Sequence, residues 1–178
     1  LYQYDLHDLI LRDDGGCLLV GEQYYSYTVT YSNGRSYYTV TYYIYNDIIV
    51  VNITPEGKIE WAEKIPKRQE TREDGGFYSS FAMAVTKDKL RFIFNDNKQN
   101  LTPKKQGDWK NFTLRDKDGI VTIVTMDTDG KYTRESLFRD AETEDYCRPK
   151  VCSQINDCQM LLFSEQGKLN RYAIVLFR

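Results

Sequence analysis

The sequence has little of what most catalytic centres need. It contains one histidine, His7, and no G-x-S-x-G, H-E-x-x-H or P-loop pattern. No apolar run approaches the roughly 20 residues that cross a membrane, and no long segment shows the helical period of 3.6 residues. The net charge of −2 gives no basic surface for nucleic acid. We therefore expect no cofactor, no membrane span and no nucleic-acid partner, and the residues specify no catalysis; His7 is expected to be structural.

Cysteine is also scarce. The chain has four: Cys17, Cys147, Cys152 and Cys158. They allow three disulfide pairings, and the sequence does not choose between these and free thiols. Their spacing matches no zinc pattern and no histidine lies nearby, so we expect no metal site.

What the sequence does contain is a repeat with a period of about 70 residues. Three similar strings carry it: LLVGEQ at Leu18–Gln23, FIFNDN at Phe92–Asn97 and LLFSEQ at Leu161–Gln166. A second pair of strings, Ile48–Trp61 and Ile120–Thr133, follows in the same register. Such self-similarity predicts a stacked or radial array of one supersecondary unit, forming a single region over residues 1–178.

Apolar alternation predicts that the units, at about residues 4–65, 77–138 and 149–178, consist of β-strands. The expected strands are Tyr4–Leu11, Cys17–Tyr31, Tyr37–Ile53 and Lys58–Ile65, then Phe77–Val85, Leu90–Asn95, Gly119–Met126 and Tyr132–Phe138, then Lys150–Gln154, Gln159–Ser164 and Leu169–Phe177. Four antiparallel strands in an even repeat are typical of a β-propeller blade. The expected fold class is all-β, a propeller-like array of about two and three-quarter blades. An open three-sheet sandwich or a β-barrel is the alternative.

The strings LRDDGGCLLVGEQYY, KIPKRQ and FIFNDN resemble those of a group of uncharacterised bacterial propeller proteins with predicted export. The resemblance covers most of the chain. It implies a propeller fold and a periplasmic, cell-surface or secreted location, and it implies no activity. The chain starts at Leu1 with no charged and apolar leader, so we expect that any export signal has been trimmed.

Eleven expected strands are too few for a closed ring, because propellers have about four or more blades. Each blade also needs neighbours over both of its faces. We therefore expect either a fragment that needs the remaining blades of a longer propeller, or a ring closed by further copies of the chain.

The longer connections between strands are expected to lie on one face of the disc, where loops commonly carry function. The first of them is rich in tyrosine, with nine between Tyr24 and Tyr45. Asn33-Gly34 predicts a type I′ turn that pairs Val29 with Tyr38. Alternation then places these side chains on one face: Tyr25, Tyr27, Val29, Tyr31, Tyr38, Val40 and Tyr42.

The tyrosines of that face are candidate binding residues, because a tyrosine ring is apolar while its hydroxyl is polar. They could pack on the disc or on a second subunit, anchor a protein partner, or stack on sugar rings. Trp109 and Lys105, on a later loop, are further candidates. The mixed charge around Lys67 and Arg72 predicts a solvated loop.

Two functions fit these features. The first is a non-catalytic binding module of an exported bacterial protein, which uses long loops on one face for a protein or glycan ligand. The alternative is part of a propeller-type glycan-active hydrolase or lyase whose catalytic residues lie outside this chain. Further blades that carry histidine or paired carboxylates facing the channel would favour the enzyme.

Overall fold

The computed structural model describes residues 3–102, 105, 107–114, 117–138, 146–166 and 169–177. These residues form three antiparallel sheets and two short 3-10 helices, η1 (Lys98–Leu101) and η2 (Pro149–Val151). The all-β expectation is confirmed. Within the described part of the chain, no helix has the length and apolarity needed to cross a membrane.

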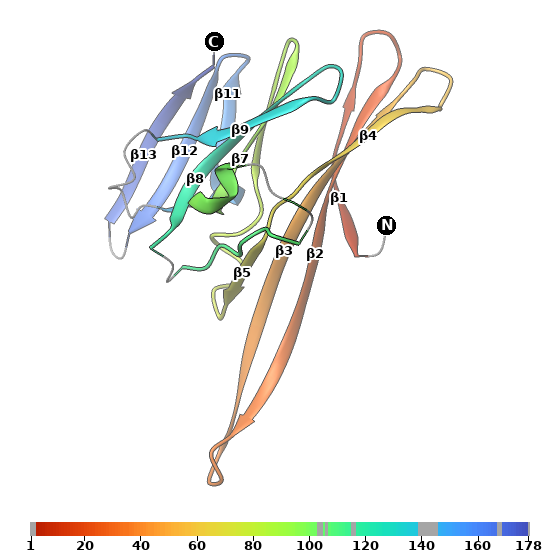
Figure 1. Ribbon diagram of the computed structural model, residues 1–178. Coiled ribbons are helices and arrows are strands. Elements are labelled where there is room, and N and C mark those ends of the chain that lie inside the picture. Colours follow the sequence, from red (N-terminus) through yellow and green to blue (C-terminus); the bar gives the residue numbers. More distant parts are fainter. Residues whose placement is uncertain are drawn as a thin grey trace.

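Each of the three sheets is built from strands that are consecutive in the chain (Figure 1). The first sheet contains β1 (Tyr4–Leu11), β2 (Cys17–Ser32), β3 (Tyr37–Ile53), β4 (Ile59–Ile65) and β5 (Gln69–Arg72). The second contains β6 (Ala82–Thr86), β7 (Lys89–Asn97), β8 (Gly119–Asp127) and β9 (Tyr132–Ser136). The third contains β10 (Tyr146–Cys147), β11 (Ser153–Asn156), β12 (Gln159–Gln166) and β13 (Leu169–Leu176).

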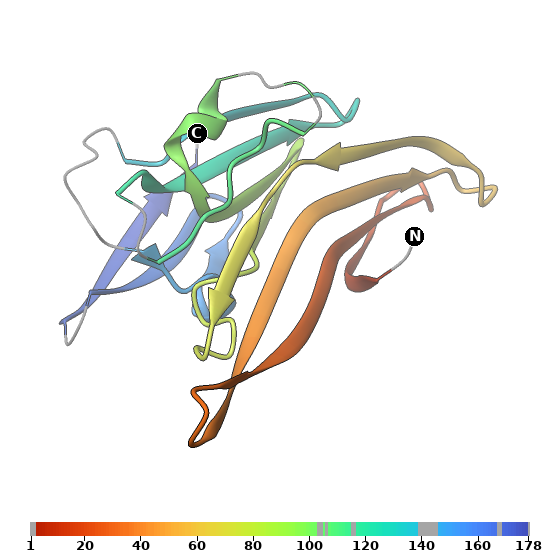
Figure 2. The same cartoon turned by 60° about the horizontal axis from the view of Figure 1, so that its bottom comes forward.

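The second sheet is packed on both faces. Its strand β7 alternates Phe92 and Phe94 on one face with Ile93 on the other, and all three side chains are completely buried. One apolar core joins Phe92 and Phe94 to Val50 and other residues of the first sheet. A separate core joins Ile93 to Leu162 and other residues of the third sheet. The middle sheet therefore covers one face of each neighbouring sheet and keeps it from water. Figure 2 shows the three sheets arranged in a row.

The outer faces of the row are apolar and uncovered by the described residues. Leu9 on β1 pairs with Leu19 on the face away from the second sheet, and Leu9 is 50% exposed. On β13, Ile174 pairs with Leu161 on the corresponding outer face and is 56% exposed. Soluble proteins seldom leave such surfaces bare, which makes both faces candidate contact surfaces.

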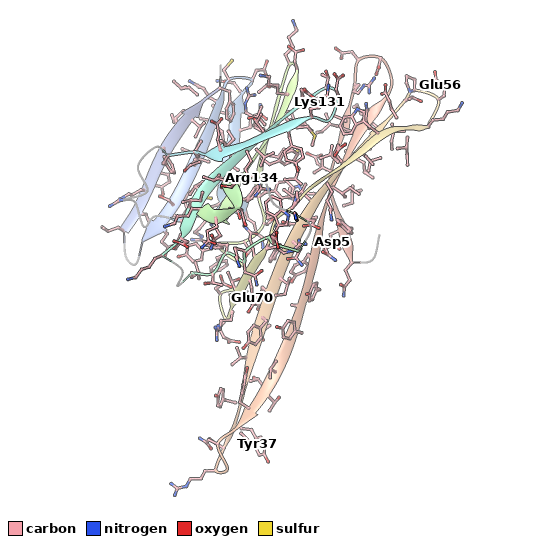
Figure 3. The ribbon with its side chains drawn as sticks, in the orientation of Figure 1. Asp5, Tyr37, Glu56, Glu70, Lys131 and Arg134 are labelled. Atoms are coloured by element: carbon pink, nitrogen blue, oxygen red, sulfur yellow. The ribbon has the colours of Figure 1, made fainter. Side chains whose placement is uncertain are left out.

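The tight turns and the long β2–β3 hairpin lie at opposite ends of the row of sheets. The tight turns β1–β2, β3–β4, β6–β7 and β8–β9 point to one end, toward the top of Figure 1. The β2–β3 hairpin points the other way and projects past all three sheets. Figure 3 shows this separation, with Glu56 and Lys131 at the turn end and Tyr37 near the hairpin tip.

Two expected strand positions were wrong. The segment expected to start a strand at Phe77 instead makes turns, with Ser80 at a φ of +75°, and β6 begins only at Ala82. The segment expected as Lys150–Gln154 begins with η2, which has Pro149 in its first turn, and β11 starts at Ser153. Strands β5 and β10 were not foreseen.

Candidate functional site

The β2–β3 hairpin beyond the body of the first sheet, residues 24–45, is here named the tyrosine arm. Its two strands continue without interruption from the strands that build the first core. At its foot, Tyr42–Tyr45 of β3 pair with β5, and the Tyr24 N–H donates to the Gln3 carbonyl at 3.0 Å. Past these contacts the arm is a two-stranded ribbon.

The register predicted for the arm was wrong by two residues. The observed pairs include Tyr31 with Tyr38 and Val29 with Val40. The reason is the Asn33 side chain, whose Oδ1 accepts from the N–H groups of Arg35 at 3.0 Å and Ser36 at 2.8 Å. Asn33 therefore flanks the turn, and Gly34, with a φ of +82°, takes its first central position as in a type II′ turn.

A shift of two residues preserves alternation, so the five predicted tyrosines do share one face, here named the tyrosine face: Tyr25, Tyr27, Tyr31, Tyr38 and Tyr42. The rings of Tyr27 and Tyr42 lie 5.0 Å apart at an angle of 7°. Those of Tyr31 and Tyr38 lie 5.2 Å apart at 18°. Each such pair adds about 0.5–1.5 kcal/mol beyond simple burial.

The tyrosine face is stacked but not covered. Tyr27 is 44% exposed and Tyr38 is 54% exposed. The hydroxyls of Tyr31 and Tyr42 share a hydrogen bond of 2.9 Å. That bond is the main reason why the pKa of Tyr31 lies above its ordinary value of 10.0, so its hydroxyl stays neutral at physiological pH. The face thus offers ordered rings whose exposed members, Tyr27, Tyr31 and Tyr38, a partner can reach.

The opposite face of the arm carries small hydroxyl side chains. They are Ser26, Thr28, Thr30, Ser32, Thr39 and Thr41. Tyr37, on this face, is 79% exposed. The only charged residue between Tyr24 and Tyr45 is Arg35 in the turn. The arm is therefore almost free of charge, unlike the rest of the surface.

An ionic cluster holds the arm at its foot. Lys67, expected in a solvated loop, is completely buried, so that expectation was wrong. Its Nζ lies 2.7 Å from Glu22 Oε1 and donates to Gln69 Oε1 at 2.8 Å and to the Tyr45 carbonyl at 3.1 Å. The Ser80 hydroxyl donates to Glu22 Oε2 at 2.6 Å. These bonds tie β2, β3 and β5 to the segment that precedes β6.

Tyr45 links this ionic cluster to η2, which lies between β10 and β11 in the chain. Lys150 Nζ donates to the Tyr45 hydroxyl at 2.6 Å and also lies 4.4 Å from the centre of its ring. Burial raises the pKa of Tyr45, so its hydroxyl is neutral and accepts from the ammonium group. Gly76 presses against the same ring, where an added Cβ would come within 2.7 Å of Tyr45 Cε2.

Trp109 and Lys105 lie on the η1–β8 connection, apart from the tyrosine face. The Arg134 guanidinium lies 4.7 Å from the centre of the Trp109 ring and pairs with the buried carboxylate of Asp96. Figure 3 shows Arg134 in the body of the protein, away from the arm. Trp109 is therefore a packing residue of the second sheet, while Lys105 is exposed.

His7 stacks on Phe81, with ring centres 4.3 Å apart, which places it against the second sheet. All four cysteines are free thiols, which resolves the choice left open by the sequence. Among the residues that the structure describes, no cluster of three or more His, Cys, Asp or Glu side chains could hold a metal ion.

A shallow groove of about 530 Å³ lies at the turn end, between the first two sheets. Several of its polar side chains already bond to one another. Arg12 donates to Asn52 Oδ1 at 2.5 Å, and Asn52 Nδ2 donates to Glu60 Oε2 at 2.8 Å. The tyrosine face, where Tyr27, Tyr31 and Tyr38 are exposed, is therefore the better candidate.

No protein-family model matches this chain, and comparisons of it with curated proteins and with solved structures find no match.

Proposed function

We propose that this chain is a non-catalytic binding module of an exported protein, and that the tyrosine face holds a protein partner. The observation that carries the proposal is the ordered stacking of Tyr27 on Tyr42 and of Tyr31 on Tyr38 on a projecting arm, with Tyr27, Tyr31 and Tyr38 exposed. The foot of the arm is fixed by a buried ion pair, so the rings are presented from a firm base.

Tyrosine is the residue type that protein interfaces favour for such a role. It supplies a large contact area at a low entropic cost, since only two side-chain torsions must be ordered. Stacking against a cross-strand neighbour restricts these torsions before any partner binds, which reduces the cost further. The near absence of charge on the arm removes a desolvation penalty that charged groups would add.

The proposal includes a propeller arrangement for the three sheets. Its support is the row of antiparallel sheets, the two successive cores and the gathering of tight turns at one end. The bare apolar faces around Leu9 and Ile174 fit contact with further blades or with further copies of the chain. The exported location is supported by the sequence resemblance alone.

The binding role is tested by capture on the immobilised chain from envelope extract and culture fluid of the source organism, followed by titration with the purified captured protein. The variant Tyr27→Ser/Tyr38→Ser removes two exposed rings from the tyrosine face. We expect it to weaken binding about 100-fold or more, as loss of central aromatic anchors does.

Tyr37→Ser is the matched control, because Tyr37 is the most exposed arm tyrosine and lies on the opposite face. It should bind as the wild type does. Equal losses in the two variants, or capture that neither variant changes, would contradict the proposal. Binding of a purified oligosaccharide, lost in Tyr27→Ser/Tyr38→Ser, would assign the face to a glycan instead.

A further inference from the structure

The two edges of the tyrosine arm differ in how many backbone groups they leave free. The Asn33 N–H donates to the Ser36 carbonyl at 3.2 Å, which sets the alternation of the ladder. Tyr31, Val29 and Tyr27 therefore bond across to β3. The residues between them direct their N–H and C=O groups outward from β2: Ser26, Thr28, Thr30 and Ser32.

On the outer edge of β3, most of the outward backbone N–H and C=O groups already have hydrogen-bond partners. Its Thr41 N–H donates to Glu73 Oε1, and its carbonyl accepts from the Glu73 N–H at 3.1 Å. Closer to the foot of the arm, β5 pairs with Tyr42–Tyr45. Only Thr39 and Tyr37 remain with outward groups near the tip.

Among the described residues, the outer edge of β2 is open along the arm beyond Tyr24. At the foot, the last described backbone contact on this edge is the bond from the Tyr24 N–H to the Gln3 carbonyl. Beyond Tyr24, no strand of the described residues pairs with this edge. A bare edge that carries no charge, no proline and no bulge is a template for another strand.

We propose that two copies of this chain pair through the β2 edges of their tyrosine arms, antiparallel and around a two-fold axis. The register that uses every outward group places Thr28 opposite Thr30 of the partner subunit and Ser26 opposite Ser32 of the partner subunit. Each of these pairs exchanges two N–H···O bonds. The axis then passes beside Val29.

The side chains support a second copy as the occupant. In this register Val29 faces Val29 of the partner subunit, and Tyr27 lies beside Tyr31 of the partner subunit, so the two tyrosine faces merge into one. No like charges meet, because Arg35 is the only charged residue on the arm. Two marginal two-stranded ribbons become one four-stranded sheet, which is the more stable state in water.

This dimer goes beyond the proposed function and does not depend on it, because it needs no other protein. Its test uses the isolated full chain in sedimentation velocity and equilibrium experiments over a wide range of concentrations. We expect a reversible monomer–dimer equilibrium. A monomer at every concentration would overturn the proposal.

A pair of proline variants tests which edge is used. Thr30 and Thr39 face each other across the ribbon, and both direct their N–H outward, so proline at either position leaves the internal ladder bonds intact. We expect Thr30→Pro to raise the dissociation constant of the dimer about tenfold or more, because two intersubunit bonds are lost. Thr39→Pro should dimerise as the wild type does. Equal effects, or no effect of Thr30→Pro in a chain that keeps its circular dichroism spectrum, would overturn the proposal.

A cysteine pair tests the register. Cys158 is exposed, so it is first replaced by serine. In that background Val29→Cys should form an intersubunit disulfide on mild oxidation, since the two positions face each other at the axis. Val40→Cys, its cross-strand neighbour on β3, should not. Equal disulfide yields for the two variants would overturn the proposed pairing.

Discussion

Lys67 Nζ lies 2.7 Å from Glu22 Oε1 in the protein interior, where the Lys67 side chain is 0% exposed and that of Glu22 is 6% exposed. Desolvation lowers the pKa of Lys67, while the charge of Glu22 opposes that shift. The pair joins the start of the β4–β5 connection to β2 at the foot of the tyrosine arm. It therefore links the position of the arm to the packing of the first two sheets.

Lys67→Met should lower the free energy of unfolding by about 3–5 kcal/mol, because it leaves the Glu22 carboxylate buried without its partner. The double variant Lys67→Met/Glu22→Gln should recover a large part of that loss, since no buried charge remains unpaired. Urea denaturation of the two single variants and the double variant measures the coupling. If the losses measured for Lys67→Met and for Glu22→Gln simply add up in the double variant, the two side chains are not coupled and the prediction is contradicted.

The same ion pair predicts a pH dependence. The pKa of Lys67 in the folded chain lies below its ordinary value of 10.5. Between the folded pKa and 10.5, the unfolded chain binds more protons than the folded one, so the free energy of unfolding rises with pH. Below the folded pKa both states hold the proton and the contribution is constant. Relative to Lys67→Met/Glu22→Gln, the wild type should gain stability as the pH rises toward 10.5; a parallel pH profile would contradict this.

Gly76→Ala should destabilise the protein more than Gly57→Ala. Both glycines have positive φ, +70° and +77°, so alanine costs about 1–2 kcal/mol of backbone strain at either position. Only at Gly76 does the new Cβ also meet the Tyr45 ring, whereas Gly57 has nothing within 4 Å. Thermal unfolding of the two variants measures the difference. Equal losses would show that the Gly76–Tyr45 contact is dispensable.

The four thiols should react in a fixed order with a water-soluble disulfide reagent. Cys158 is exposed and should react first. Cys147 is buried, and burial raises its pKa well above 9.0, so both access and thiolate content are low and it should react last. Mass spectrometry of peptides after timed labelling reads the order. Rapid labelling of Cys147 in the folded chain would contradict the packing of the second core.

Strands β1 to β4 of the first sheet could be predicted well, since alternation and turn signals agree there. The expected Tyr4–Leu11 and Tyr37–Ile53 coincide with β1 and β3. The tyrosine face was also predicted correctly, because membership of a face depends only on alternation along each strand. The register depended instead on one side chain, Asn33, which caps the turn rather than occupying its centre.

The buried polar residues that hold the foot of the tyrosine arm could not be predicted from apolar patterns. Strand β5 buries Gln69 and Thr71 and exposes Arg72, so its alternation is polar on both faces. Lysine is almost never fully buried, which made a solvated Lys67 the reasonable expectation. The available signal was the spacing of Lys67, Gln69 and Thr71 at every second position, which is the period of one strand face.

The most direct test of the binding account replaces Tyr27 with a photo-crosslinking phenylalanine analogue in the natural, full-length protein in its source organism. We expect light-dependent adducts with a polypeptide of different sequence, and far fewer when the same analogue replaces Tyr37 on the opposite face. Adducts that contain only further copies of this chain, or equal yields from the two positions, would contradict partner capture by the tyrosine face.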